Sequence, residues 1–205
     1  MDKKYKIILV VLVILLIVIG AYVLMCYKNE MDNREFKEVL KNVSDIENIT
    51  DKNYASVYSG KSISIDDYII FSQSDSDNAS KEIKLLKEFK NKTFNQTQKD
   101  FLELQINRLE KEKLSHEKDV DLGNQCKRYY NGEITASKYS DLQKTNAEER
   151  DKINSEVSKI KDETIIYLDN YRELKAILEE IDVDEDFYIN EKGGTTGNGR
   201  VYFTK

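Results

Sequence analysis

The 205-residue sequence predicts an all-α protein: one N-terminal transmembrane helix, an extracytoplasmic antiparallel helical bundle or coiled-coil hairpin of three to four helices, and a flexible C-terminal tail. Three observations lead to this class. Residues 7–25 are an apolar run without a charge, an amide or a proline. The chain has no proline or tryptophan and 34% charged residues, which is typical of long helices with solvated faces. After the run, apolar residues recur at spacings of three and four.

The apolar segment 7–26 is predicted to be an uncleaved signal anchor. Nineteen residues of α-helix rise about 28 Å, close to the thickness of the hydrocarbon core of a bilayer. A cleaved signal peptide has a shorter apolar core and small residues at its cleavage site. A lipoprotein signal ending at Cys26 calls for a small residue where Met25 stands. A helix in a soluble core would show a polar face, and this segment shows none.

Lysine positions predict the orientation. Lys3, Lys4 and Lys6 precede the apolar segment, whereas Lys28 is the only cation just after it and Glu30 follows. Because lysine is enriched in cytoplasmic flanks, we expect a single-pass cell-membrane protein with its N-terminus inside. The predicted organisation is a cytoplasmic N-terminus (1–6), the anchor (7–26), an extracytoplasmic helical domain (27–181) and an acidic, then glycine-rich, flexible tail (182–205).

The first external helix is predicted over residues 32–50, where apolar residues follow helical spacing. No glycine or proline separates it from the anchor, so the two can form one helix reaching Thr50. Ser64 with Asp67 has the form of an N-cap. We favour a short helix after Ser64 over a strand through the isoleucine-rich residues 62–71. Residues 72–78 (SQSDSDN) are predicted to be a polar loop.

Two longer helices are expected next. One restarts near Ser80 and continues after a second capping signal at Thr97, with a break or kink at Gly123 and a C-terminal end at Gly132. The other begins near Thr135 and runs to about Ile181, with a repeat close to 3.5 residues in its later part. A helix of that length implies a long hairpin partner, another subunit or a break near Thr145.

No catalytic, cofactor-binding or metal-ligating set is predicted. Asp182, Asp184 and Asp186 resemble a calcium loop, but Phe187 stands where the turn needs glycine and Gly193 where a glutamate should bind. The single histidine, His116, lies in a charged run and is expected to be a solvent-exposed helix residue. A buried carboxylate cluster with perturbed pKa values would be the arrangement that indicates an enzyme.

Three other residue types remain open to two interpretations. Five Asn-x-Ser/Thr triplets are candidate glycosylation sites or a product of asparagine-rich composition: Asn42, Asn48, Asn78, Asn91 and Asn95. Cys126 is interpreted as a free thiol, with an intermolecular disulfide as the alternative. Tyrosines flank the last predicted hairpin and are expected to pack at the edge of the core, with an aromatic binding surface as the alternative: Tyr129, Tyr130, Tyr139, Tyr167 and Tyr171.

The expected function follows from the anchor and the helices. The net charge of −6 comes from interspersed charges, so nothing suggests nucleic-acid binding and no nucleic-acid partner is expected. We expect a non-enzymatic cell-surface protein without a cofactor. It would act through protein–protein or envelope contacts, including self-association by its amphipathic helices, with the bilayer bound by residues 7–26. The alternative is an extracytoplasmic ligand-binding or sensory helical module that works with a membrane partner.

Overall fold

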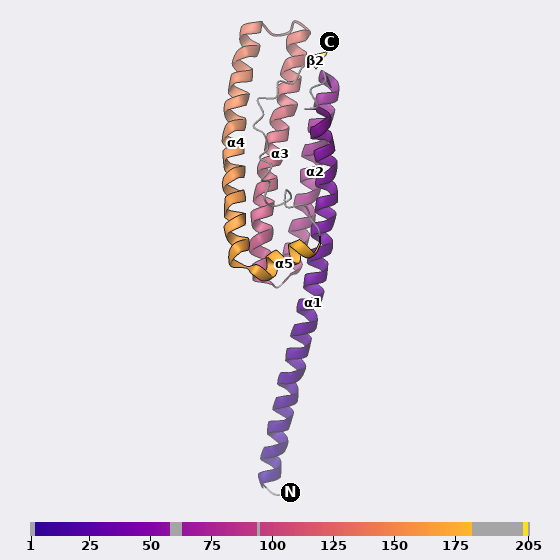
Figure 1. The fold of residues 1–205 in the computed structure, drawn as a ribbon, viewed down its shortest axis with the longest axis vertical. Coiled ribbons are helices and arrows are strands. Elements are labelled where there is room, and N and C mark those ends of the chain that lie inside the picture. Colours follow the sequence, from indigo (N-terminus) through magenta and orange to yellow (C-terminus); the bar gives the residue numbers. More distant parts are fainter. Residues whose placement is uncertain (1–2, 58–62, 94, 182–202, 205) are drawn as a thin grey trace.

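The computed structural model describes residues 3–57, 63–93, 95–181 and 203–204, and within these ranges the predicted all-α class is confirmed. The helices are α1 (Lys3–Val57), α2 (Ile65–Lys92), α3 (Gln96–Tyr130), α4 (Ala136–Asn170) and α5 (Arg172–Glu180). Two-residue strands β1 (Ile63–Ser64) and β2 (Phe203–Thr204) pair in parallel. α1 packs on α2, α2 on α3 and α3 on α4, and α5 crosses one end of these helices (Figure 1).

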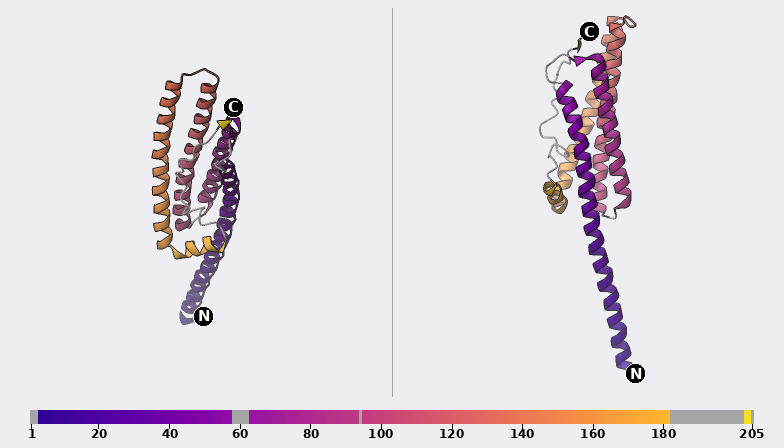
Figure 2. Two further views of the ribbon diagram at one scale, coloured as in Figure 1. Left: turned by 45° about the horizontal axis from the view of Figure 1, so that its top comes forward. Right: turned by 90° about the vertical axis from the view of Figure 1, so that its right-hand side faces the viewer.

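Helix α1 is unbroken over 55 residues and has two different parts. Its N-terminal part projects as a rod, and the rest packs along the other helices (Figures 1 and 2). We call residues 31–57 together with α2 to α5 the helical body; its proximal end is where the rod leaves it, and its distal end is opposite. In the described chain α1 is the one helix long and apolar enough to cross a membrane, and its apolar window is wholly exposed. α1 continues past Thr50 to Val57, since no proline and no glycine follows the apolar segment to end it earlier.

Local sequence signals set several helix ends. The Ser64 side chain accepts a hydrogen bond from the backbone N–H of Asp67, so the predicted N-cap and the helix after it are confirmed. Thr135 caps α4 in the same way through the N–H of Lys138. Gly132 follows the end of α3 with φ of +75°, a left-handed conformation that favours glycine.

The expected loop at residues 72–78 is wrong, as is the expected restart near Ser80. α2 runs without interruption from Ile65 to Lys92, and Ser72 and Asp75 within the expected loop are buried. Tertiary contacts override the low helix propensity of this polar stretch, because neighbouring helices supply partners for its side chains.

Helix α3 also differs from expectation at two positions. Its N-cap is Asn95, whose side chain accepts from the N–H of Gln98, rather than Thr97. Gly123 neither breaks nor kinks the helix into two. A Cβ atom at Gly123 would lie 2.5 Å from Cγ1 of Ile69, so this glycine allows α2 and α3 to approach closely.

The long final helix is interrupted at Tyr171 and not near Thr145. α4 packs along α3 as its hairpin partner, and the backbone turns at Tyr171, where φ is −122° and ψ is 72°. α5 then crosses the proximal end, where Leu174 and Leu178 are buried in the core. An ion pair between Lys37 and Glu180 joins α1 to α5.

The interior changes character along the helical body. The apolar core occupies the proximal part and contains Phe36, Leu40, Val43, Ile83, Leu86, Phe89, Phe101, Leu102, Ile106, Leu109, Leu168, Leu174 and Leu178. Toward the distal end the buried side chains are largely polar or small, including Ser72, Asp75, Ser76, Asn78, Ala79, Asp119 and Asn146. Since fully burying a large apolar side chain contributes about 1.5–3 kcal/mol, the proximal part supplies most of the hydrophobic stabilisation.

Most of the predicted C-terminal tail, residues 182–202 and 205, lies outside the described residues. Phe203 and Thr204 are described, and they pair with Ile63 and Ser64 at the distal end. At these two positions the chain is therefore held against β1, unlike the free tail expected there.

Candidate functional site

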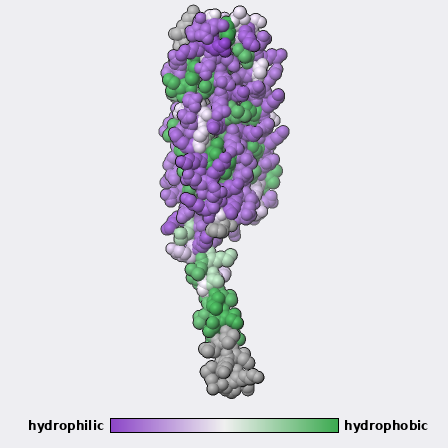
Figure 3. All heavy atoms as spheres, turned by 180° about the vertical axis from the view of Figure 1, so that it is seen from behind, coloured by the Kyte–Doolittle hydropathy of each residue, from purple (hydrophilic) through white to green (hydrophobic). Residues whose placement is uncertain are grey.

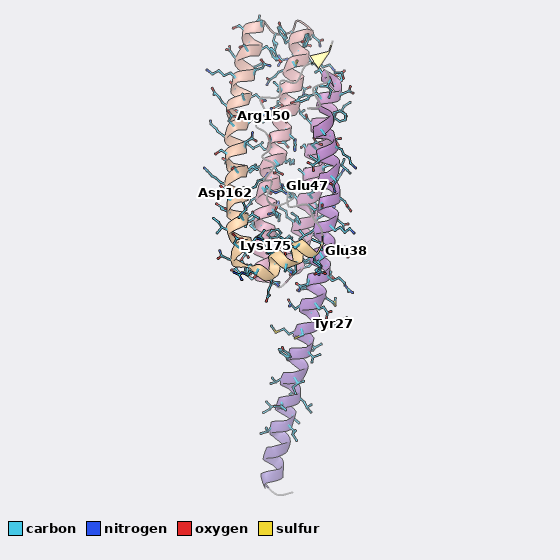
Figure 4. All side chains as sticks on the ribbon, in the orientation of Figure 1. Tyr27, Glu38, Glu47, Arg150, Asp162 and Lys175 are labelled. Atoms are coloured by element: carbon cyan, nitrogen blue, oxygen red, sulfur yellow. The ribbon has the colours of Figure 1, made fainter. Side chains whose placement is uncertain are left out.

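The most unusual feature of the helical body is a group of charged side chains beside the apolar core. We call Glu47, Glu82, Arg108 and Glu112 the buried charge cluster. They come from α1, α2 and α3: the three glutamates lie about one helical turn distal to the core residues Val43, Leu86 and Leu109, and Arg108 directly precedes Leu109. Glu47 lies on α1 at about mid-height of the helical body (Figure 4).

Arg108 is the centre of the cluster. Its side chain is 4% exposed, and its Nη2 donates to Oε1 of Glu47 at 2.6 Å. Nη1 donates to both carboxylate oxygens of Glu112, each at 3.0 Å, and Nε donates to Oε1 of Gln105 at 3.1 Å. The planar guanidinium fork suits such multidentate pairing. Arg108 thereby connects α1 to α3 at this level.

The hydrogen bonds extend from Arg108 to α4. Nε2 of Gln105 lies 3.5 Å from the hydroxyl of Thr164, which donates to the backbone carbonyl of Ile160. Gln105 and Thr164 have no exposed surface. Lys161 adds a second positive charge, with its Nζ 3.8 Å from Glu112.

Glu82 is the member of the cluster that is not fully satisfied. It is 2% exposed, and its Oε2 atom is buried without a hydrogen-bond partner. Burial, followed by the negative charge of Glu47, raises the pKa of Glu82 to about 9, although Arg108 opposes the shift. The described geometry therefore favours the neutral carboxylic acid at Glu82 near pH 7.

The other members of the cluster respond differently. Burial raises the pKa of Glu47 to about 7 against the attraction of Arg108, while its side chain keeps 20% exposure. Burial by itself lowers the pKa of Arg108, but the charges of Glu112 and Glu47 outweigh it and the net shift is upward. Arg108 therefore stays charged, and Glu47 and Glu82 are the cluster residues whose raised pKa values favour proton uptake.

A second polar layer lies distal to the cluster. Asp119 on α3 accepts from the Tyr68 hydroxyl on α2 and from Arg150 on α4, both at 2.8 Å. Asp75 on α2 accepts from the Asn53 amide on α1 at 2.7 Å, and its pKa is raised chiefly by burial. These contacts link neighbouring helices by hydrogen bonds where apolar packing is sparse.

The predicted site residues are distributed over the surface and are not gathered into one site. Asn42, Asn48 and Asn91 are exposed, and Asn95 is half-buried as the cap of α3. Asn78 is 4% exposed and its amide points to Thr50, which leaves no room for a glycan in the folded chain. His116 is half-buried and not solvent-exposed as expected, because it shares the inward side of α3 with Asp119.

The cysteines and tyrosines have identifiable surroundings. Both Cys26 and Cys126 are free thiols, exposed and buried respectively. Tyr129 stacks on Tyr139 with ring centroids 4.8 Å apart, and Tyr130 tilts against Tyr129. At the other end of α4, Tyr167 packs against Tyr171. The hydroxyl of Tyr167 donates a hydrogen bond to the backbone carbonyl of Thr97. The Tyr129–Tyr139 stack and the Tyr167 hydrogen bond join α3 to α4, whereas Tyr130 and Tyr171 are exposed.

The sequence interpretation missed the buried charge cluster. The available signal was continued spacing: inward-facing positions of α3 recur at three and four residues through Gln98, Leu102, Gln105, Leu109, Glu112, His116, Asp119, Gly123 and Cys126. The same spacing on α2 passes through Tyr68, Ser72, Asp75, Ala79, Glu82, Leu86 and Phe89. A search for apolar residues alone does not detect polar residues in these positions.

The cluster brings three carboxyl groups and one guanidinium together between α1, α2 and α3. Within the described ranges, no three His, Cys, Asp or Glu side chains are arranged to hold a metal ion, and the three candidate aspartates near residue 184 lie outside those ranges. Two surface hollows lie on the outer faces of α2 and α5, and neither is lined by a cluster residue. Comparison with protein-family models, curated proteins and solved structures found no match.

Proposed function

We propose that the chain is a single-pass membrane protein with a cytoplasmic N-terminus, whose extracytoplasmic helical bundle acts at the cell surface through contact with another protein or an envelope component, without catalysing a reaction. One observation carries this proposal: α1 runs unbroken from its exposed apolar part into the core, where Phe36, Leu40 and Val43 are fully buried. The membrane anchor and the helical body therefore share one helix, and the body cannot turn independently of the anchor.

The same helix fixes the distance from the bilayer. Asn33, whose side chain accepts from Gln98 at the proximal end of the helical body, is eight positions after Met25. At 1.5 Å per residue this is about 12 Å, roughly the depth of a headgroup layer plus a few ångströms. The distal end is then presented farthest from the membrane. The viewed face of the body is mainly hydrophilic, whereas the projecting part of α1 is hydrophobic (Figure 3).

The burial of Glu82 and Arg108 supports a non-enzymatic role. A catalytic carboxyl needs to reach a substrate, and Glu82 and Arg108 are covered on α1, α2 and α3. Ion pairs such as Lys111 with Glu156 and Lys118 with Glu149 join α3 to α4 on the outside of the hairpin.

A topology experiment followed by crosslinking in intact cells tests the proposal. Protease added to intact cells should remove the helical body, and a photocrosslinking residue at exposed Ile70 or Ile166 should form a reproducible adduct with one protein or envelope polymer. The matched control keeps residues 1–30 and carries an unrelated helical body. Protection of the body from protease, or the same adducts with the control, would refute the proposal.

A ligand-binding sensory module is the second candidate, and the polar interior near Asp75 and Asp119 is the observation that favours it. Helical bundles can hold small polar ligands between helices. Thermal unfolding of the full chain in detergent, screened against small metabolites and ions, distinguishes the two. A saturable rise in melting temperature that is lost in Asp119→Asn would favour the sensory role over the contact role.

A further inference from the structure

The contacts between α1 and α2 form a ladder that ends at Glu82. The Asn53 amide donates to Asp75 at 2.7 Å, and the Asn78 amide donates to Thr50 at 3.4 Å. One turn further along the two antiparallel helices, Glu47 faces Glu82. In the first contact an amide donates to a carboxylate, and in the second an amide donates to a hydroxyl. The third contact brings the carboxyl groups of Glu47 and Glu82 together.

The charges around Glu82 do not balance if every group is ionised. From α1 it faces Glu47 and Asp51, and from α3 it faces Glu112 and Arg108. From α4, the Nζ atom of Lys161 lies 3.8 Å from Glu112. The guanidinium of Arg108 is therefore shared among three glutamates, and it donates hydrogen bonds to Glu47 and Glu112.

A proton resolves this imbalance. An ionised carboxylate is strongly disfavoured in a buried position unless donors stabilise it, and Oε2 of Glu82 has no donor. The neutral acid carries no charge to be solvated and does not repel Glu47. We propose that Glu82 is protonated while α1 is docked on α2 and α3, and that it releases this proton when residues 44–57 of α1 separate from them.

The coupling has a definite sign. A glutamate in water has a pKa of about 4.3, and the pKa of Glu82 in the docked structure is raised to about 9. Docking therefore takes up a proton between these values, and the ratio of docked to undocked α1 falls about tenfold for each unit that the pH rises. Glu47, with its pKa raised to about 7, adds a second proton only at lower pH. Alkaline pH therefore weakens the docking of residues 44–57 of α1 on α2 and α3, and acidic pH strengthens it.

The consequence concerns the connection between membrane and helical body. The proximal half of the α1 contact is made by buried apolar residues, including Phe36 and Leu40, and does not titrate. The distal half contains the carboxyl ladder. Proton release at Glu82 therefore loosens the end of α1 farthest from the membrane while the anchor stays attached. This inference does not depend on the identity of a surface partner.

Hydrogen exchange of the full chain in lipid nanodiscs tests the proposal. Protection of residues 44–57, corrected for the intrinsic exchange rate at each pH, should fall about 30-fold between pH 7.0 and pH 8.5. Residues 101–109 of α3, which belong to the apolar core, should keep their protection. Wild-type protection of 44–57 that does not change with pH would overturn the proposal.

Two variants make the test specific. Glu82→Gln keeps the size of the side chain but cannot titrate, so the 30-fold change should disappear. The control is Glu88→Gln, because Glu88 lies on the same helix and 54% of its side chain is exposed. This variant should keep the wild-type change of protection with pH. A Glu82→Gln chain with an unaltered pH dependence would also overturn the proposal.

A direct measurement covers the case in which Glu82→Gln does not fold. Infrared difference spectra of the wild-type chain should show a protonated carboxyl band that persists at pH 7.5 and disappears above pH 9, where ordinary glutamates have long been ionised. Absence of that band at pH 7.5 would contradict a protonated Glu82. Its presence would support the proposal without any substitution.

Discussion

Replacing Arg108 with methionine removes the guanidinium that pairs with Glu47 and Glu112 beside the buried Glu82. Methionine fills much of the same volume without charge, so the change tests the ion pairs and creates little cavity. The variant loses the bonds to Glu47 at 2.6 Å and to Glu112 at 3.0 Å, together with the bond to Gln105 at 3.1 Å. Glu47 and Glu82 then face each other without the guanidinium, and a positive charge that remains beside the cluster is Lys161, 3.8 Å from Glu112.

The expected loss of stability depends on pH. Removing one partner of a buried ion pair costs about 3–5 kcal/mol. Glu47 and Glu112 keep 20% and 25% exposure, so partial hydration places the loss near the lower limit, at about 3 kcal/mol at pH 8. At pH 5 Glu47 is protonated in the folded chain, because its pKa is raised to about 7, and the loss should fall to roughly half.

Urea unfolding of the full chain in detergent micelles, followed by circular dichroism, measures both values. Arg128→Met is the matched control: Arg128 is 54% exposed, lies 3.5 Å from Glu133 and should change the free energy of unfolding by less than about 0.5 kcal/mol. A loss below 1 kcal/mol for Arg108→Met at pH 8, or an equal loss at pH 5 and pH 8, would show that the cluster does not have the electrostatic role argued above.

Three further outcomes are expected. Ser64→Ala removes the cap of α2 and should lower the free energy of unfolding by about 1 kcal/mol in the same urea assay. Gly123→Ala should destabilise by roughly 1–2 kcal/mol, because overpacking against Ile69 at 2.5 Å outweighs the gain in helix propensity; in an Ile69→Ala background the same change should become neutral or stabilising. In a host that glycosylates Asn-x-Ser/Thr, intact-protein mass spectrometry should find the same attached glycan mass on the Asn78→Gln variant as on the wild type, since Asn78 is buried. Asn42 is exposed and is therefore open to modification.

Some features of the fold were predictable because they depend on nearby residues. The cap at Ser64 requires only a hydroxyl three residues before the backbone N–H of Asp67, which has no partner within the helix. Gly132 follows the end of α3 because its φ of +75° is a conformation that favours glycine. The length of α1 follows from an apolar run joined to an amphipathic segment without a glycine or proline between them. The all-α class rests on the same local rules.

The errors have one physical origin. Ser72 and Asp75 looked like a loop because a polar residue at a helical position is normally solvated. In the structure Asp75 is buried because Asn53, 22 residues earlier, donates to it from α1. Likewise, the break at Tyr171 has no glycine or proline to mark it, and it permits Leu174 and Leu178 to enter the core at the proximal end.

The sequence by itself determined the N-terminal helix long and apolar enough to span a membrane, the helical class and the helix ends at Ser64, Gly132 and Thr135, since each depends on hydrophobicity or on hydrogen bonds within a few residues. Only the tertiary structure decided which polar residues face inward. Glu82 and Arg108 occupy helical positions that, in sequence, resemble any solvated charged face. Their burial depends on α1 covering them and on Glu47 reaching Arg108 across 61 residues of chain, and no local pattern specifies that contact.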